Sequence, residues 1–216
     1  MFTQRSDYQN WLKNESESSA LLVHGRSKPT AHVSPLSYLC ARIAQEYVDK
    51  DRIIVLSYFC GLPSRDQQAN ATDLLCRIIG QLLSHKEMSA IYSKDPLECD
   101  LERRIKKKDF RVLLKVFAML IWRLRSCNLV IFCLIDSITK IETGNQRKNT
   151  ESLLKELNKI VRGLQGRKRK KSDRLVFKLL VNDGARSFNA HTFFRSWDTI
   201  NMADGAFGTG IGGLRF

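Results

Sequence analysis

The sequence predicts an α/β fold in which a parallel sheet lies between two layers of helices. Four apolar runs predict buried strands, at residues 20–24, 52–59, 129–135 and 175–181. Between them, apolar residues recur every three to four positions, which is the spacing of amphipathic helices. Strands that alternate with helices favour a parallel sheet with right-handed crossovers, and uninterrupted apolar strands favour burial on both faces.

Helical spacing locates the flanking elements. Tyr8, Trp11 and Leu12 share one face of a short lead-in helix within the first 19 residues. Residues 85–109 are polar and predict a surface connection with short helical pieces. Longer amphipathic helices are predicted at residues 36–48, 71–84, 110–125 and 150–164. The expected organisation is a lead-in helix (1–19), one α/β domain (20–187) and an irregular C-terminal tail (188–216).

The chain is strongly basic, with a formal net charge of +14 over 216 residues. Two runs, at 103–108 and 167–171, hold ten of the 36 lysines and arginines. Such a charge favours acidic partners, but two basic loops on a neutral fold explain the total equally well. We expect both runs to be exposed, so that replacing residues 167–171 by serine leaves the thermal midpoint nearly unchanged.

The six cysteines include no C-x-x-C pair, which argues against a zinc or redox motif. Cys40, Cys76 and Cys133 lie within apolar patterns and are expected to be buried. The N-terminus lacks the apolar core of a signal peptide, and the longest uncharged apolar run, residues 126–135, is too short to span a bilayer. We expect a cytoplasmic protein without a membrane partner; the basic run at 166–171 leaves a nuclear location open.

Two junctions carry the expected chemistry. The first strand ends at His24 and Gly25, and a helix follows after a polar loop; in this context backbone amides can hold a phosphate. The third strand is followed directly by Asp136. A carboxylate at this position is typical of a magnesium site, although an aspartate here can also act as a turn or helix-cap residue. We expect the third strand to lie beside the first, with Gly25 and Asp136 at the same edge of the sheet.

These features resemble the P-loop NTPase domain of the NACHT/STAND class, in the nephrocystin-3-like N-terminal form common in filamentous fungi. That form has an apolar strand, His-Gly and a Walker A loop, G-x-x-x-x-G-K-[ST]. The resemblance covers roughly residues 5–187, and the segment 73–83 matches the family helix pattern L-L-x-x-L-L-x-Q-L-L closely. The second glycine and the lysine of this loop are absent. Counted from Gly25 without a gap, the three positions Gly-Lys-[ST] hold Thr30, Ala31 and His32. With one inserted residue they hold residues 31–33.

The second family motif is also changed. An apolar strand followed by Asp-Gly-Leu-Asp-Glu is replaced here by Asp136, Ser137, Ile138, Thr139 and Lys140. The first acid remains, whereas the pair that would orient water for hydrolysis is lost. A later arginine, Arg186, is displaced from the position of the family's sensor residue.

The resemblance implies a degenerate nucleotide-binding module of a signalling or scaffold protein, without ATPase activity. ATP and magnesium would bind weakly or not at all, between the Gly25 loop and Asp136, the relict magnesium position. The candidate nucleotide contacts are Gly25, Arg26, Ser27, Lys28, Thr30 and His32. Implied partners are nucleotide, other protein domains or a second copy of the chain.

Two alternatives stay open. The chain could bind nucleic acid through its two basic runs, without sequence preference and with steep salt dependence. It could also be an active ATPase whose lysine comes from elsewhere, which the loss of both the lysine and the second acid disfavours. The four histidines show no metal or catalytic-triad spacing, so no other catalysis is proposed.

Overall fold

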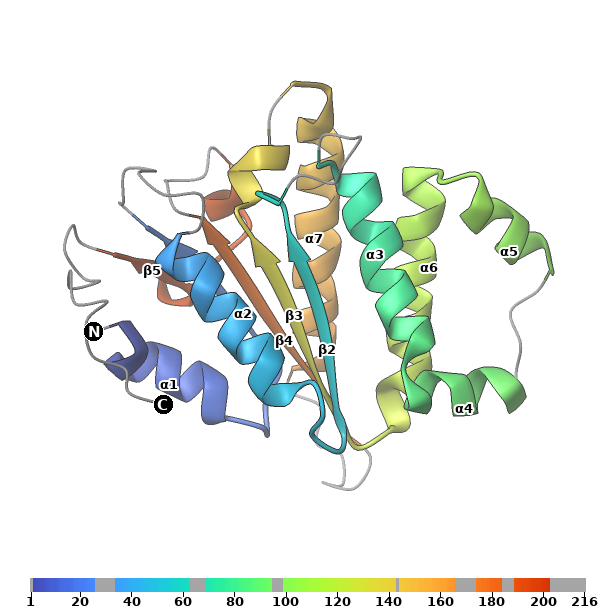
Figure 1. The fold of residues 1–216 in the computed structure, drawn as a ribbon, viewed down its shortest axis with the longest axis horizontal. Coiled ribbons are helices and arrows are strands. Elements are labelled where there is room, and N and C mark those ends of the chain that lie inside the picture. Colours follow the sequence, from blue (N-terminus) through green and yellow to red (C-terminus); the bar gives the residue numbers. More distant parts are fainter. Residues whose placement is uncertain are drawn as a thin grey trace.

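A five-stranded, all-parallel sheet forms the centre of the protein (Figure 1). The computed structural model describes residues 2–25, 34–62, 69–94, 99–142, 144–165, 174–183 and 189–202. The strand order is β2-β3-β4-β1-β5. The strands are β1 (Ser19–His24), β2 (Ile53–Phe59), β3 (Leu129–Asp136), β4 (Leu175–Asp183) and β5 (Thr199–Asn201).

Four of these strands are those predicted from the apolar runs, and β5 is an addition that the sequence pattern did not indicate. The expectation that the third strand lies beside the first is wrong. β4 lies between them, pairing with β3 on one side and with β1 on the other. The error arose because order along the chain does not specify order across a parallel sheet, where crossover helices allow strands to be skipped.

Helices cover both faces of the sheet and produce three layers (Figure 1). One face is covered by α1 (Ser6–Lys13) and α2 (Pro35–Tyr47), the other by α3 (Ala71–Ser84), α6 (Phe110–Arg123) and α7 (Arg147–Leu164). Two short helices, α4 (Lys86–Lys94) and α5 (Cys99–Lys106), connect α3 to α6. The 3₁₀ turns are η1 (Phe2–Gln4), η2 (Leu124–Ser126), η3 (Ile138–Ile141), η4 (Gly144–Gln146), η6 (Ala190–Thr192) and η7 (Ser196–Asp198). The three-layer α/β prediction is confirmed.

Side-chain caps explain where three of the long helices begin. Ser34 accepts a hydrogen bond from the Ser37 amide at the start of α2, and Pro35 occupies the first helical position. Asn70 caps α3 and Asp109 caps α6 in the same way. A cap satisfies one of the amides that the first turn of a helix leaves without a partner, so the polar residue sets the boundary of the apolar periodicity.

The core consists of two apolar layers, one on each side of the sheet. The larger lies under α3, α6 and α7, and the smaller lies under α1 and α2. Because successive strand residues point to opposite faces, each central strand contributes to both layers. Cys40 and Cys133 are buried as expected, while Cys76 is only half-buried.

The described lysines and arginines of the first basic run are exposed, as predicted; they are Arg103, Lys106, Lys107 and Lys108. The second run, 167–171, lies outside the described residues. Within the described ranges, no helix combines the length and the apolar character needed to cross a membrane.

Candidate site at the carboxyl edge of the sheet

The ends of β1, β3 and β4 bring buried polar groups together at one edge of the sheet. The Gly25 amide donates to the Asp183 carbonyl at 2.7 Å, which joins the end of β1 to the end of β4. Asp136 is the last residue of β3. Gly25 and Asp136 therefore lie at the same edge, as predicted. The other candidate contacts, Arg26, Ser27, Lys28, Thr30, His32 and Arg186, lie outside the described residues.

Asp136 is held by hydroxyl groups from two directions. Ser37, in the first turn of α2, donates to both carboxylate oxygens, at 2.9 and 2.8 Å. Ser137 donates to Oδ2 at 3.0 Å. Ser34 Oγ lies 2.9 Å from Ser37 Oγ, so a chain of hydroxyls runs from the helix cap to the carboxylate. The strand end and the helix start are thus joined across 99 residues of sequence.

The environment of Asp136 opposes its charge. The side chain is buried, and burial raises the pKa of this carboxyl group, with Asp183 adding a smaller contribution in the same direction. The hydroxyl donors Ser37 and Ser137 counteract part of this effect because they stabilise the ionised form. A cation placed beside Asp136 would offset part of the same penalty.

Asn182 connects the site to the underside of α2. Its amide nitrogen lies 2.8 Å from Cys40 Sγ and 3.3 Å from the Leu36 carbonyl. Its side-chain oxygen accepts a long hydrogen bond of 3.4 Å from the Ser137 amide. Burial raises the pKa of the Cys40 thiol strongly, and nearby Asp136 raises it further, so this cysteine stays protonated. Asn182 therefore positions backbone around Asp136 from the neighbouring strand.

The turn after Asp136 has an unusual backbone. Ser137 adopts φ 58° and ψ 49°, the left-handed region that favours glycine. This conformation turns the chain into η3, whose Thr139 amide donates to the Asp183 carboxylate at 2.6 Å. Thr139 thus contributes a backbone amide to the site, and the neighbouring Lys140 is exposed.

The strand order makes the same edge a candidate binding position. From β1 the chain continues to β2 at one margin of the sheet, whereas from β4 it continues to β5 at the other. The connections therefore leave two adjacent strands in opposite directions. In open parallel sheets, ligands bind outside the carboxyl ends of strands at such a switch point. Here the switch point lies between the end of β1, at His24–Gly25, and the end of β4, at Asn182–Asp183, with Asp136 on the next strand.

Sequence reasoning identified Gly25 and Asp136 but missed Ser37, Asn182 and Asp183. Ser37 could have been suspected because Ser34-Pro35 marks a helix start, which places Ser37 in the first turn. Asn182 and Asp183 end an apolar strand just as Asp136 does. In the described part of the chain, no group of three or more histidine, cysteine or acidic side chains could hold a metal ion on its own.

Comparison with known proteins identifies the family of this chain. A search of curated proteins finds no match. A family model, that of the nephrocystin 3 N-terminal region, matches residues 1–177. The match extends from the lead-in helix α1 into β4, and so includes Gly25, Ser37 and Asp136. The chain therefore belongs to the nephrocystin 3 N-terminal family.

Proposed function

We propose that this protein is a nucleotide-binding module of the NACHT-like P-loop type that does not hydrolyse ATP. The observation that carries the proposal is the Ser37–Asp136 pair at the switch point of the sheet. In P-loop NTPases, magnesium is held by a serine or threonine that follows the phosphate loop and by an aspartate at the end of a strand. Ser37 and Asp136 match these two ligands in residue type, and Ser37 lies in the first turn of the helix after the loop, although five residues beyond position 32, which an ungapped count from Gly25 gives.

The backbone after Asp136 supports the same assignment. The family motif Asp-Gly-Leu-Asp-Glu has glycine directly after the first aspartate. Here Ser137 takes the left-handed conformation that glycine adopts most readily. A glycine-like backbone at this position agrees with a retained turn whose side chains have changed.

The set of phosphate-binding residues expected for a P-loop is incomplete. In the P-loop pattern a lysine immediately precedes the hydroxyl residue. Alignment on Ser37 puts Leu36 at that position, and Leu36 is buried in the core with 1% of its surface exposed. We therefore expect weak binding, with the magnesium ligands contributing more than the loop.

Hydrolysis needs a group that orients the attacking water. At the positions of the second acidic pair stand Thr139, whose amide is bound to Asp183, and the exposed Lys140. A hydroxyl group is too weak a base at neutral pH, and an ammonium group has no free lone pair. The proposed role is that of a switch or scaffold, in which bound nucleotide shifts the population between conformations that differ in contacts with other domains or with a second copy.

The test combines calorimetric titration with a phosphate-release assay. We expect binding of ATP only when magnesium is present, and no release of phosphate above background. Asp136→Ala should abolish this binding and Ser37→Ala should weaken it. Ser152→Ala, which removes an exposed hydroxyl on α7, should leave it unchanged. Circular dichroism of each variant establishes that it is folded.

Three results would contradict the proposal. Binding of ATP that is independent of magnesium and unchanged in folded Asp136→Ala would show that the nucleotide does not bind at this edge of the sheet. Turnover that disappears in Asp136→Ala would make the protein an enzyme. Wild-type protein that binds no ATP at millimolar concentration would exclude the nucleotide-binding role.

The nucleic-acid alternative is favoured by the exposure of the first basic run. This run ends just before α6 begins, level with the carboxyl edge of the sheet (Figure 1). The second run lies outside the described residues.

A further inference from the structure

The outer face of α7 carries a shallow cavity of about 490 Å³. It lies on the opposite side of the sheet from α2 and the Asp136 site. Its lining combines positively charged side chains with an aromatic ring and two polar groups: Lys155, Asn158, Lys159, Arg162, Gly163, Thr192 and Phe193. None of these described lining residues is acidic.

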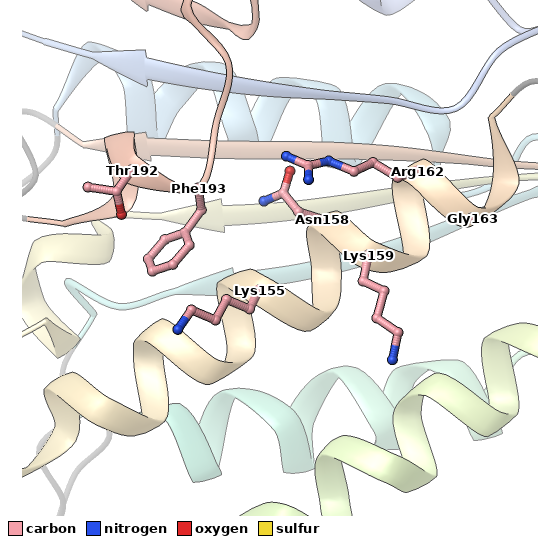
Figure 2. A pocket seen from close by; sticks show the side chains of 7 residues that line it. All are labelled: Lys155, Asn158, Lys159, Arg162, Gly163, Thr192 and Phe193. Atoms are coloured by element: carbon pink, nitrogen blue, oxygen red, sulfur yellow. The ribbon is translucent and has the colours of Figure 1, made fainter.

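The cations are spread along α7. Lys155, Lys159 and Arg162 are separated by four and three residues and are exposed. At 1.5 Å per residue, the backbone positions of the first and last are about 10 Å apart along the helix axis. Figure 2 shows the Lys159 and Arg162 side chains extending from opposite sides of the helix. Cations spread in this way suit an extended chain of phosphates better than a single phosphate group. Lys159 is partly balanced by Glu156, at 3.5 Å.

The aromatic ring of Phe193 lies beside Lys155. Figure 2 shows Phe193 beside α7, with the Lys155 side chain running toward its ring. Lys155 Nζ lies 5.6 Å from the ring centroid, within the range of a cation–π contact. Asn158 and Arg162 lie next to each other on the same side of the helix (Figure 2). Phe193 is half-buried and keeps part of its ring accessible from the cavity.

A second aromatic side chain, Trp197, is exposed in η7, which follows Phe193 along the chain. Burial raises the pKa of the adjacent Asp198, and the positive charges of Arg195 and Arg162 oppose this shift. The residue before Asp198 is Trp197, whose side chain is 71% exposed and lies 5.3 Å from the Arg195 guanidinium carbon.

We propose that the α7 face, with Phe193 and Trp197, binds single-stranded nucleic acid. Proteins that bind single strands without sequence preference combine a track of cations for the backbone with aromatic side chains on which bases stack. An acidic peptide would use the cations but would leave the two accessible rings without a purpose. A duplex would not expose its bases to them. The inference is independent of the nucleotide site around Asp136.

The experiment measures the fluorescence anisotropy of a labelled 12-residue oligothymidylate with the full chain, over a series of salt concentrations. We expect log affinity to fall linearly with log salt. In Lys155→Ala/Lys159→Ala, the loss of two phosphate contacts should reduce the slope by about 1.4, since each contact contributes about 0.7 for a single strand. The matched control, Lys106→Ala/Lys107→Ala, removes two exposed lysines at the end of α5 and should change the slope much less.

The aromatic part is tested separately. Trp197→Ala should weaken binding at least about fivefold, because stacking contributes about 1 kcal/mol or more per base. The substitution is expected to fold normally because the side chain is exposed. Phe193→Leu should act in the same direction, although Phe193 also packs against the core, and its melting curve is therefore compared with wild type.

Several outcomes would overturn the proposal. One is the absence of binding at low salt. Another is an equal loss of affinity in the α5 control. A third is unchanged affinity in Trp197→Ala together with equal competition by a duplex of the same length or by heparin, which would show attraction by charge alone. Tighter, Trp197-dependent binding of a polyglutamate peptide would assign the face to an acidic protein segment instead.

Discussion

The two faces of the sheet bury different chemistry, and strand β4 shows this in consecutive residues. Phe177, Leu179 and Val181 point into the apolar layer under α3, α6 and α7. Lys178 and Asn182 alternate with them and therefore point toward α1 and α2, as Leu180 does. On that second face lie also Ser37, Cys40 and Asp136.

Along β4 this alternation places groups with different energetics on the two sides of the sheet. The apolar layer gains free energy by removing hydrocarbon from water. Buried polar groups each require a partner, and each costs free energy where the partner is imperfect. Lys178, Asn182 and Asp136 are such groups on the side of α1 and α2, and Thr150 and Asn158 of α7 are buried polar residues on the other side.

The largest expected effect tests the apolar face. Phe177→Ala removes a fully buried ring and should lower the free energy of unfolding by about 3–5 kcal/mol. Chemical denaturation monitored by circular dichroism measures it. Tyr38→Ala, at a side chain that is 54% exposed, is the control and should change stability by less than about 0.5 kcal/mol. A small loss for Phe177→Ala would mean that this layer repacks freely.

Substitution of the neighbouring residue, Lys178, should instead raise the free energy of unfolding. Lys178 is buried with a hydrogen bond of 2.9 Å to Ser19, and burial lowers its pKa to about 8. The folded state therefore binds fewer protons than the unfolded state between pH 8 and 10.5, and this group destabilises the fold most below pH 8. Lys178→Met should raise the free energy of unfolding at pH 7 by up to about 3 kcal/mol.

The pH dependence separates this explanation from simple repacking. The advantage of Lys178→Met over wild type should shrink as the pH rises from 8 toward 10, because the wild-type penalty disappears as the amine loses its proton. Urea denaturation of both proteins at several pH values measures the difference. A constant difference across this range would show that the charge of Lys178 is already compensated in the fold.

A pair of glycines tests how tightly helices pack on the apolar side. A Cβ on Gly163 of α7 would lie 2.9 Å from Trp122 Cη2, so Gly163→Ala should lower stability by about 1–2 kcal/mol despite the better helix propensity. Gly80 of α3 has no atom within 4 Å of the added carbon, and Gly80→Ala should raise stability by about 0.5–1 kcal/mol. Thermal melts compare the two variants directly. If both substitutions raised the stability, α6 and α7 would be loosely packed around Gly163.

A further small effect is expected at the edge of the sheet. Gln81 of α3 accepts from the Ser57 amide at 2.8 Å and donates to the Ser57 carbonyl at 2.9 Å, so it satisfies both groups on edge strand β2. Gln81→Ala should lower stability by about 1 kcal/mol and increase self-association, because unpaired edge groups can join another strand. Light scattering measures the association. Gln45→Ala, an exposed glutamine on α2, should be without effect.

The sequence predicted more of the fold than of the site. Apolar periodicity located α3 at its observed bounds and β3 to within one residue, because both patterns are local. The same reasoning found Asp136, which stands where an apolar run stops. It did not find Ser37, whose role depends on a partner 99 residues away, nor the burial of Lys178, which an apolar strand with one polar residue does not reveal.

The sequence by itself determined the order and type of the main elements and placed an acid at the end of a strand. Only the tertiary structure decided that β4 separates β1 from β3, that Ser37 meets Asp136, and that Lys155, Arg162 and Phe193 share one cavity. The physical reason is the range of the interactions. Periodicity and caps act over a few residues, whereas the partner of a strand edge or of a buried polar group is selected by packing of the whole chain.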